Sequence, residues 1–302
     1  MTSPLRFGLG EDWWVYHKDK KCYDISRDAL GSCFSFNTTQ GQPGTAVLTG
    51  SRLTALVVVD MQNFFLHPQC NDYPEGLEAA ERTVEVVAKC RKLGIQIIWL
   101  NWGLTEQDLI TMPPAVHRGF SSELIDDKKD GKLPGGGRTI AAWFRLRYGL
   151  WPGQTPHQIT DPDIMAVAKS WNAELYESLL QVSDAEQDIF CDKNRMSGMW
   201  TDKTPLYEAV KGQFHTLLFA GVNTDQCVLG TLVDAYDRGL DCVMLEDCCA
   251  TRTPGGKEAT TWNISRSYGF VTDSKSFCDG IELKTDDEKL SFLGLPEGHP
   301  GL

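Results

Sequence analysis

The sequence lacks the features of a membrane or secreted protein. Nowhere in its 302 residues do about 18 uncharged apolar residues run together, the length that a membrane-spanning helix requires. The amino terminus, MTSPLRFGLGEDWWVYHKDK, has no charged segment followed by an apolar one, which is the pattern of a secretory signal. We therefore expect a cytoplasmic protein with no membrane partner.

Dense clusters of basic residues are also missing. The chain has 29 Lys and Arg residues against 41 Asp and Glu residues, a formal net charge of -12. Binding to nucleic acid needs a concentrated cationic face that neutralises phosphates. The charge balance thus excludes a nucleic-acid partner and favours a small-molecule ligand.

Metal-binding and dinucleotide-binding motifs are absent as well. The ten cysteines form no CxxC pair of the zinc-binding type, and in a chain of this length we expect most of them to be reduced, buried, small apolar side chains. No GxGxxG motif follows the first apolar run, which argues against a Rossmann dehydrogenase. The histidines form no close ligand pair and stand at positions 17, 67, 117, 157, 215 and 299. We expect neither a metal nor another cofactor.

The sequence does contain apolar runs that alternate with amphipathic segments. The runs are LTALVVVD (53–60), IQIIWLNW (95–102), DIFC (188–191), TLLFAGV (216–222) and DCVMLED (241–247). Uninterrupted runs rich in β-branched residues are typical of parallel strands covered on both faces. Helices are predicted before Gly94, after the N-cap Thr204, and after GVNTD. The last is expected to bury Val228, Leu232, Val233 and Tyr236. The pattern predicts an α/β three-layer sandwich around a parallel sheet.

Two regions fall outside this alternation. Residues 1–52 precede the first predicted strand and hold an aromatic cluster that must be buried on the domain or across a dimer: Trp13, Trp14 and Tyr16. Residues 103–172 belong to an interval far longer than an ordinary crossover, and we interpret them as an insertion that forms a lid or a specificity region. The predicted organisation is an N-terminal extension (1–52), a main α/β domain (53–285) and a C-terminal tail (286–302).

Three chemically distinct residues follow predicted strands. Asp60 closes the longest apolar run, Lys193 follows DIFCD, and Cys227 lies in the turn and helix start after TLLFAGV. Ligands bind at the carboxyl ends of strands in doubly wound sheets, so we expect the three side chains to converge.

These residues suit nucleophilic catalysis. A cysteine thiol needs help to act as a nucleophile, and Lys193 together with the positive end of the helix would favour the thiolate of Cys227. Asp60 would accept the thiol proton and return it to a leaving group. Each residue also has a structural interpretation, as a packed core thiol, a turn carboxylate and a solvated loop lysine.

Three stretches in this order resemble one protein family. VVVDMQNFF, CDKNRMSGMWTDKTPL and LLFAGVNTDQCVLGTLVDAYDRGLDCVMLEDCCAT are similar to the isochorismatase-like cysteine hydrolases, which include nicotinamidases, N-carbamoylsarcosine amidases and ureidoacrylate amidohydrolases. The resemblance runs from about residue 53 to 280 and implies a six-stranded parallel sheet. It implies a catalytic triad of Asp60, Lys193 and Cys227. It also implies a cis peptide before Asn223, an oxyanion hole made by the N–H groups of Asn223 and Cys227, and a homo-oligomer.

The sequence departs from the family pattern at positions that bear on the choice of substrate. Family nicotinamidases carry an Asp and His metal cluster after the second strand, whereas this chain has WLNWGLTEQDL there, without histidine. NWGLTEQD and KSWNAELYESL look similar to the ureidoacrylate amidohydrolase branch. We therefore expect hydrolysis of a C–N bond in an amide, carbamoyl or ureido group, through a thioester on Cys227. The alternatives are vinyl-ether hydrolysis of isochorismate and a non-catalytic binding protein of the same fold.

Residues near the triad in sequence are candidates for substrate contact. They are Gln62, Phe64, Asn101, Trp102 and Trp171. The insertion adds aromatic and basic residues that would suit a planar or carboxylated substrate, or else form a small separate core with solvated arginines. They are His117, Arg118, Trp143, Phe144, Arg145, Arg147 and Trp151.

Overall fold

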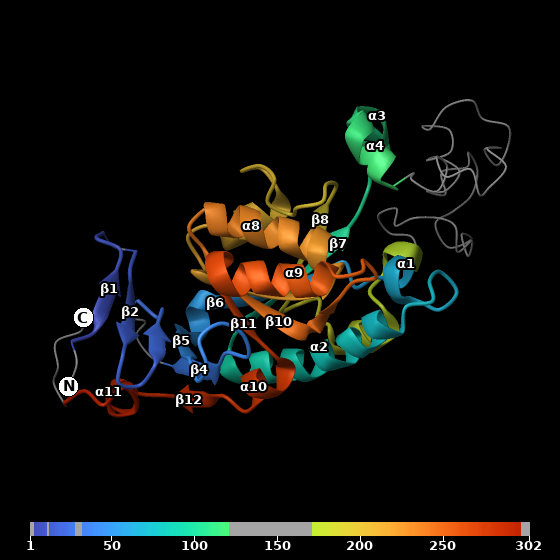
Figure 1. The fold of residues 1–302 in the computed structure, drawn as a ribbon. Coiled ribbons are helices and arrows are strands. Elements are labelled where there is room, and N and C mark those ends of the chain that lie inside the picture. The colour runs from blue at the N-terminus through green and yellow to red at the C-terminus, as the bar shows by residue number, and fades with distance from the viewer. Residues whose placement is uncertain (1–2, 11, 28–31, 121–170, 297–302) are drawn as a thin grey trace, which may run out of the picture.

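The computed structural model of the chain describes residues 3–10, 12–27, 32–120 and 171–296 (Figure 1). The strands are β1 (Leu5–Phe7), β2 (Trp14–His17), β3 (Cys22–Asp24), β4 (Cys33–Asn37), β5 (Ala46–Gly50), β6 (Thr54–Val59), β7 (Gln96–Trp102), β8 (Ile189–Lys193), β9 (Thr216–Val222), β10 (Asp241–Ala250), β11 (Phe270–Thr272) and β12 (Ile281–Leu283). The α-helices are α1 (Asn63–Leu66), α2 (Pro74–Leu93), α3 (Glu106–Thr111), α4 (Pro114–Phe120), α6 (Glu177–Val182), α7 (Pro205–Val210), α8 (Leu229–Asp237), α9 (Gly256–Asn263), α10 (Ser274–Cys278) and α11 (Asp286–Leu293). Shorter helical turns are η1 (Ser51–Leu53), η5 (Trp171–Ala173), η6 (Thr224–Val228) and η7 (Ile264–Tyr268).

The main sheet has six parallel strands in the order β11-β10-β9-β6-β7-β8. Strands β6 and β9, at its centre, are buried along their whole length, as their apolar runs predict. The predicted parallel sheet is confirmed, and β11 is its sixth strand. Because all strands run in one direction, the residues after β6, β8 and β9 meet at a single edge.

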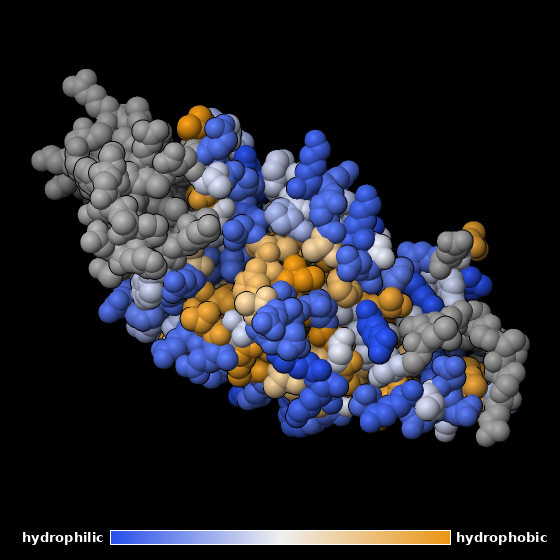
Figure 2. All heavy atoms as spheres, turned by 180° about the vertical axis from the view of Figure 1, so that it is seen from behind, coloured by the Kyte–Doolittle hydropathy of each residue, from blue (hydrophilic) through white to orange (hydrophobic). Residues whose placement is uncertain are grey.

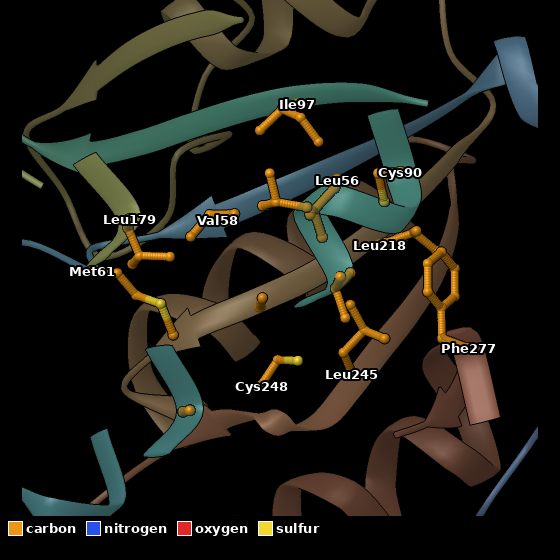
Figure 3. Close-up of a cluster of buried hydrophobic side chains, with 14 of the residues drawn as sticks. Leu56, Val58, Met61, Cys90, Ile97, Leu179, Leu218, Leu245, Cys248 and Phe277 are labelled. Carbon is orange, nitrogen blue, oxygen red and sulfur yellow. The ribbon is translucent and has the colours of Figure 1, made fainter. Parts of the chain in front are cut away.

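Helices cover both faces of this sheet and complete the predicted three layers. On one face, α2, α6 and α10 enclose an apolar core with side chains of β6, β7, β9 and β10 (Figure 3). On the other face, α7, α8 and η7 enclose a second apolar core. Helix α2 ends at Gly94, which has a left-handed φ of 70°, and Thr204 accepts a hydrogen bond from the Tyr207 N–H at the start of α7. Both helix boundaries agree with the sequence signals.

The buried face of α8 differs from the predicted one. Val228 and Leu232 are buried, but Tyr236 is 43% exposed and Val233 is half-buried. Thr231 and Ala235 face the sheet instead. The sequence argument selected the most apolar side chains, whereas the helix presents to the sheet the small residues that allow its close approach.

The N-terminal extension forms a second sheet, which lies beside the main one (Figure 1). Its strand order is β1-β2-β3-β5-β4-β12, so one strand comes from the other end of the chain. Strand β12 pairs with β4, and Leu293 of α11 packs in the core of this second sheet. The boundary predicted at residue 285 therefore does not coincide with one in the structure, because the pairing partner of β12 lies in the extension.

A buried ion pair fastens the extension to the main sheet. The Arg27 guanidinium donates to Asp241, at the start of β10, with Nη2 2.8 Å from Oδ1. The Trp14 indole N–H donates to the same carboxylate at 2.8 Å, and its ring lies against that of Phe270. The side chains of Arg27 and Asp241 are 6% and 3% exposed. The sequence allowed the aromatic cluster to be buried on its own domain or across a dimer. In the structure, Trp14 packs on its own domain.

Removal of this anchor should destabilise the fold. We expect Asp241→Asn to lower the free energy of unfolding by about 3 kcal/mol, because among the described residues it leaves the exposed Asp12 as the one charged partner of the buried Arg27 guanidinium, beside the Ile25 carbonyl. Urea denaturation measures the change. Asp279→Asn is the matched control, since its pair with Lys275 is exposed and should contribute nothing measurable. Equal midpoints for the two variants would contradict the expectation.

Among the helices that the structure describes, none combines the length and apolar character needed to cross a membrane.

Candidate active site

Asp60 stands at the carboxyl end of β6 in an unusual backbone conformation. Its φ is 53°, in the left-handed region that Asp tolerates better than most residues. Its N–H donates to the Leu100 carbonyl at 2.8 Å, which ties the end of β6 to β7. The side chain has no exposed surface. The carboxylate is thereby held at the sheet edge, inside the protein.

Lys193 is the last residue of β8 and its ammonium group contacts the other two triad candidates. Nζ lies 2.9 Å from Asp60 Oδ2 and donates to Cys227 Sγ at 3.4 Å. It also donates to the Arg195 carbonyl at 3.2 Å, and the Trp102 ring lies 4.1 Å away. The ammonium group thus forms an ion pair with Asp60 and donates hydrogen bonds to the sulfur and to a carbonyl oxygen. The three side chains that the sequence predicted to converge are in contact.

Cys227 lies in the helical turn η6, directly after β9. The chain turns tightly there because β9 approaches β6 closely: Gly221 has a φ of 135°, and a Cβ at this position would lie 2.2 Å from the Val59 carbonyl oxygen. The Val222–Asn223 peptide bond is cis, as the resemblance implies. Cys227 therefore lies at the same edge of the main sheet as Asp60.

Burial determines the protonation of the resting site. It raises the pKa of the Cys227 thiol, an effect that the Lys193 charge opposes and the Asp60 charge adds to. Burial also raises the pKa of Asp60, again against the opposing charge of Lys193. The sequence argument expected Lys193 and the helix start to favour a thiolate, but desolvation outweighs them because the sulfur lies inside the fold. Burial thus favours the protonated form of both groups, and the Lys193 ammonium, 2.9 Å from Asp60 Oδ2 and 3.4 Å from Cys227 Sγ, opposes it at each.

Two of the predicted substrate contacts are fully buried and make structural contacts. The Gln62 amide donates to the Trp102 and Ala173 carbonyls at 2.9 and 2.8 Å. The Trp102 N–H donates back to Gln62 Oε1 at 2.8 Å. Both N–H donors of Gln62 are therefore used in joining β7 to the segment before α6. The Trp102 ring lies against the Lys193 ammonium and has no exposed surface.

The other three predicted contacts are half-buried around the same edge. Phe64 lies edge-on to Phe65 in α1. Trp171 packs edge-on against His67, and its carbonyl accepts a hydrogen bond from the Asn63 amide at 2.9 Å. Asn101, near the end of β7, has a buried Oδ1 with no hydrogen-bond partner among the described residues. None of these contacts joins the three residues to the triad, so their role in substrate binding stays a prediction.

The insertion is described only at its two ends. Helices α3 and α4 follow β7, and Asp108 of α3 accepts a hydrogen bond from the Asn194 amide at 2.6 Å, directly after Lys193. The start of the insertion therefore contacts the loop that carries the triad lysine. The predicted aromatic and arginine wall of Trp143, Phe144, Arg145, Arg147 and Trp151 lies outside the described residues.

Two residues that the sequence argument missed contact the site. Met196 Sδ lies 3.5 Å from Cys227 Sγ. The Tyr73 hydroxyl donates to Asn223 Oδ1 at 3.1 Å, and Tyr73 is buried. Tyr73 carries no sequence signal, and Met196 could have been found from its place in CDKNRMSGMWTDKTPL, three residues after Lys193. Within the described ranges, no group of three His, Cys, Asp or Glu side chains is arranged to hold a metal ion.

Comparisons with known proteins bear on this site. An isochorismatase domain model matches residues 54–131 and 152–276. The ureidoacrylate amidohydrolase RutB of Cronobacter sakazakii is 26% identical over 236 residues, which cover 76% of this chain and 88% of that protein. A solved isochorismatase family protein from Desulfovibrio vulgaris is 21% identical, with a TM-score of 0.53 over 76% of this chain and 97% of that one. A solved cysteine hydrolase from Pseudomonas syringae pv. phaseolicola is 18% identical, with a TM-score of 0.52 over 76% and 92%. The two structures share the α/β fold described above.

Proposed function

Because the chain belongs to the isochorismatase family, we propose that it is a cysteine hydrolase that cleaves a C–N bond of an amide, carbamoyl or ureido group in a small molecule. One observation carries the proposal. The Lys193 ammonium lies 2.9 Å from the Asp60 carboxylate and 3.4 Å from the Cys227 sulfur, so an acid–base group and a nucleophile share one buried cation. Such a constellation suits acyl transfer.

The first half of the proposed reaction forms a thioester. Cys227 Sγ attacks the substrate carbonyl carbon while its proton passes to Asp60, and the carbonyl π electrons move to the oxygen. The tetrahedral intermediate then collapses: the C–N bond breaks, and Asp60 returns the proton to the leaving nitrogen. The amine or ammonia departs, and the acyl group remains on sulfur.

The second half regenerates the enzyme. A water molecule attacks the thioester carbon and gives one proton to Asp60. The C–S bond breaks, the acid product leaves, and the sulfur recovers its proton from Asp60. Lys193 holds both groups in place and stabilises negative charge on either of them, since its N–H donors reach both.

The oxyanion of each tetrahedral intermediate needs hydrogen-bond donors. The backbone N–H groups of Asn223 and Cys227 are proposed for this role, because they flank the turn into η6 that presents the sulfur. The Tyr73 hydroxyl supports Asn223 by donating to its side-chain oxygen. The helix start adds a positive electrostatic potential near the same atoms.

A substrate panel tests the proposed reaction. Primary amides, N-carbamoyl amino acids, ureido acids and isochorismate are each incubated with the wild-type protein and with Cys227→Ala. We expect ammonia or amine release from at least one C–N substrate, abolished in the variant. Turnover of isochorismate alone, retained by Cys227→Ala, would instead support vinyl-ether hydrolysis and overturn the proposal.

The active protein is proposed to be a homo-oligomer. Hydrophobic side chains gather near the centre of the face in Figure 2, between hydrophilic ones. Large apolar side chains are also exposed on α6 and on the edge strand β8, where Leu180 and Phe190 are 50% and 48% exposed. Gathered apolar surface is characteristic of interaction sites. Light scattering measures the molar mass of the purified protein and so distinguishes a monomer from an oligomer.

A further inference from the structure

Met196 lies on the sulfur that the proposed reaction uses as nucleophile. Its Sδ is 3.5 Å from Cys227 Sγ. The two residues differ in exposure, because Met196 is 43% exposed and Cys227 only 5%. The other side chains that contact the sulfur, Asp60 and Lys193, are buried. Of these three side chains in the described part of the chain, Met196 is the one that is exposed to solvent.

The loop that carries Met196 is held in place by the site itself. The Lys193 ammonium donates to the Arg195 carbonyl at 3.2 Å, immediately before Met196 in the chain. The Arg195 guanidinium donates to the Asn194 carbonyl at 2.7 Å and stacks over the Trp200 ring at 5.2 Å. The triad lysine thus positions both the nucleophile and the residue that covers it.

Helix α8 limits where the Met196 side chain can go. A Cβ added at Gly230 would lie 3.4 Å from Met196 Cγ, so the side chain runs close along the first turn of this helix. A methyl group at position 230 would lie at van der Waals distance from the Met196 side chain. The side chain also borders solvent, since Met196 is 43% exposed.

We propose that Met196 is a gate over Cys227, which a substrate must displace to bring its carbonyl carbon to the sulfur, and that Met196 is a specificity-determining residue. The part of this inference that concerns substrates rests on the function proposed above. The part that concerns access to the Cys227 sulfur does not rest on that function, since it describes the protein without substrate.

The chemistry of methionine suits this position. A thioether has no proton to exchange, so it does not compete with Asp60 for the thiol proton. The side chain is unbranched and has three rotatable bonds, which lets it swing aside and repack against bound ligands. We expect it to admit a planar acyl or ureido group, which can slide between the two sulfurs, in preference to a branched acyl group.

Alkylation of the thiol tests the gate without any substrate. Wild-type protein, Met196→Ala and Met196→Leu are treated with iodoacetamide, and the rate of modification at Cys227 is followed by peptide mass spectrometry. We expect an increase of about tenfold in Met196→Ala and little change in Met196→Leu, which keeps a side chain of similar volume. The half-buried Cys278 provides an internal reference in every sample. The rates are compared across a range of pH, so that a change in the pKa of the thiol is separated from a change in access.

Each outcome of this experiment either supports or overturns the proposed gate. An alkylation rate at Cys227 that is the same in Met196→Ala and wild type, relative to Cys278, would overturn the gate. If Met196→Ala does not fold, Met196→Phe replaces it and should slow alkylation several-fold; an unchanged rate would again overturn the proposal. For substrates, Met196→Ala should lower KM for branched acyl amides more than for planar ones. Failure of the hydrolase proposal would appear separately, as an alkylated Cys227 in a protein that turns over no C–N substrate.

Discussion

Cys227→Ala is expected to reduce kcat/KM on every C–N substrate of this protein by at least about 10⁴-fold, because it removes the atom proposed to form the thioester. The fold should survive, since the side chain is small and only its sulfur contacts the triad. Ammonia release measures activity, and the thermal midpoint reports folding.

The matched control is another buried cysteine. Cys191 lies in β8, two residues before Lys193, and packs in the apolar core on the α7 and α8 side of the sheet. Cys191→Ala should lower stability slightly and leave kcat/KM within a few-fold of wild type. Full turnover by Cys227→Ala would eliminate the thioester mechanism.

Asp60→Asn should damage both activity and stability. The substitution removes the proposed proton acceptor, which contributes about 10²–10⁴-fold in rate. It also leaves the Lys193 ammonium buried without a counter-ion, which costs about 3–5 kcal/mol in the free energy of unfolding. The two side chains are 0% and 1% exposed, so solvent screening does not reduce this cost.

A double variant separates the two effects. Asp60→Asn combined with Lys193→Met removes both charges, and we expect it to recover much of the stability lost in Asp60→Asn but none of the activity. Urea denaturation and ammonia release give the two readouts. A double variant as unstable as Asp60→Asn would mean that the ion pair is not what the single substitution disturbs.

The pH dependence of kcat/KM should report Asp60. Asp60 must be ionised in the free enzyme to accept the thiol proton, and burial raises its pKa above the usual carboxyl value of 3.8. Activity should therefore fall as pH decreases through this raised pKa, at a pH higher than an exposed aspartate would give. An acid limb at the ordinary carboxyl value would argue against Asp60 as the base.

Five of the six strands of the main sheet could be predicted because their signal is local, whereas β11, only three residues long, could not. Each apolar run, such as residues 53–60, carries enough β-branched and aliphatic residues to specify a buried strand without reference to its neighbours. The same holds for the end of α2 at Gly94 and the start of α7 at Thr204, where one residue type decides the boundary. Asp60, Lys193 and Cys227 could be found because each follows such a strand.

The second sheet could not be predicted in this way. Its strands are three to five residues long, too short for a periodic pattern, and β4 gains its partner β12 from nearly the opposite end of the chain. The structural role of Gln62 could not be predicted from the sequence either. Its position next to Asp60 suggested substrate contact, but its hydrogen bonds to Trp102 and Ala173 come from residues brought near only by folding.

By itself, the sequence determined the layered α/β architecture and the identity of the three triad candidates, because hydrophobic pattern and strand direction together bring strand ends to one edge of a parallel sheet. Only the tertiary structure decided the burial that raises the pKa of the Cys227 thiol, the contact of Met196 with its sulfur and the docking of the extension through Arg27 and Asp241. The physical reason is common to all three: desolvation, contact and ion pairing depend on which distant atoms surround a group, and no neighbouring residue in the chain specifies them.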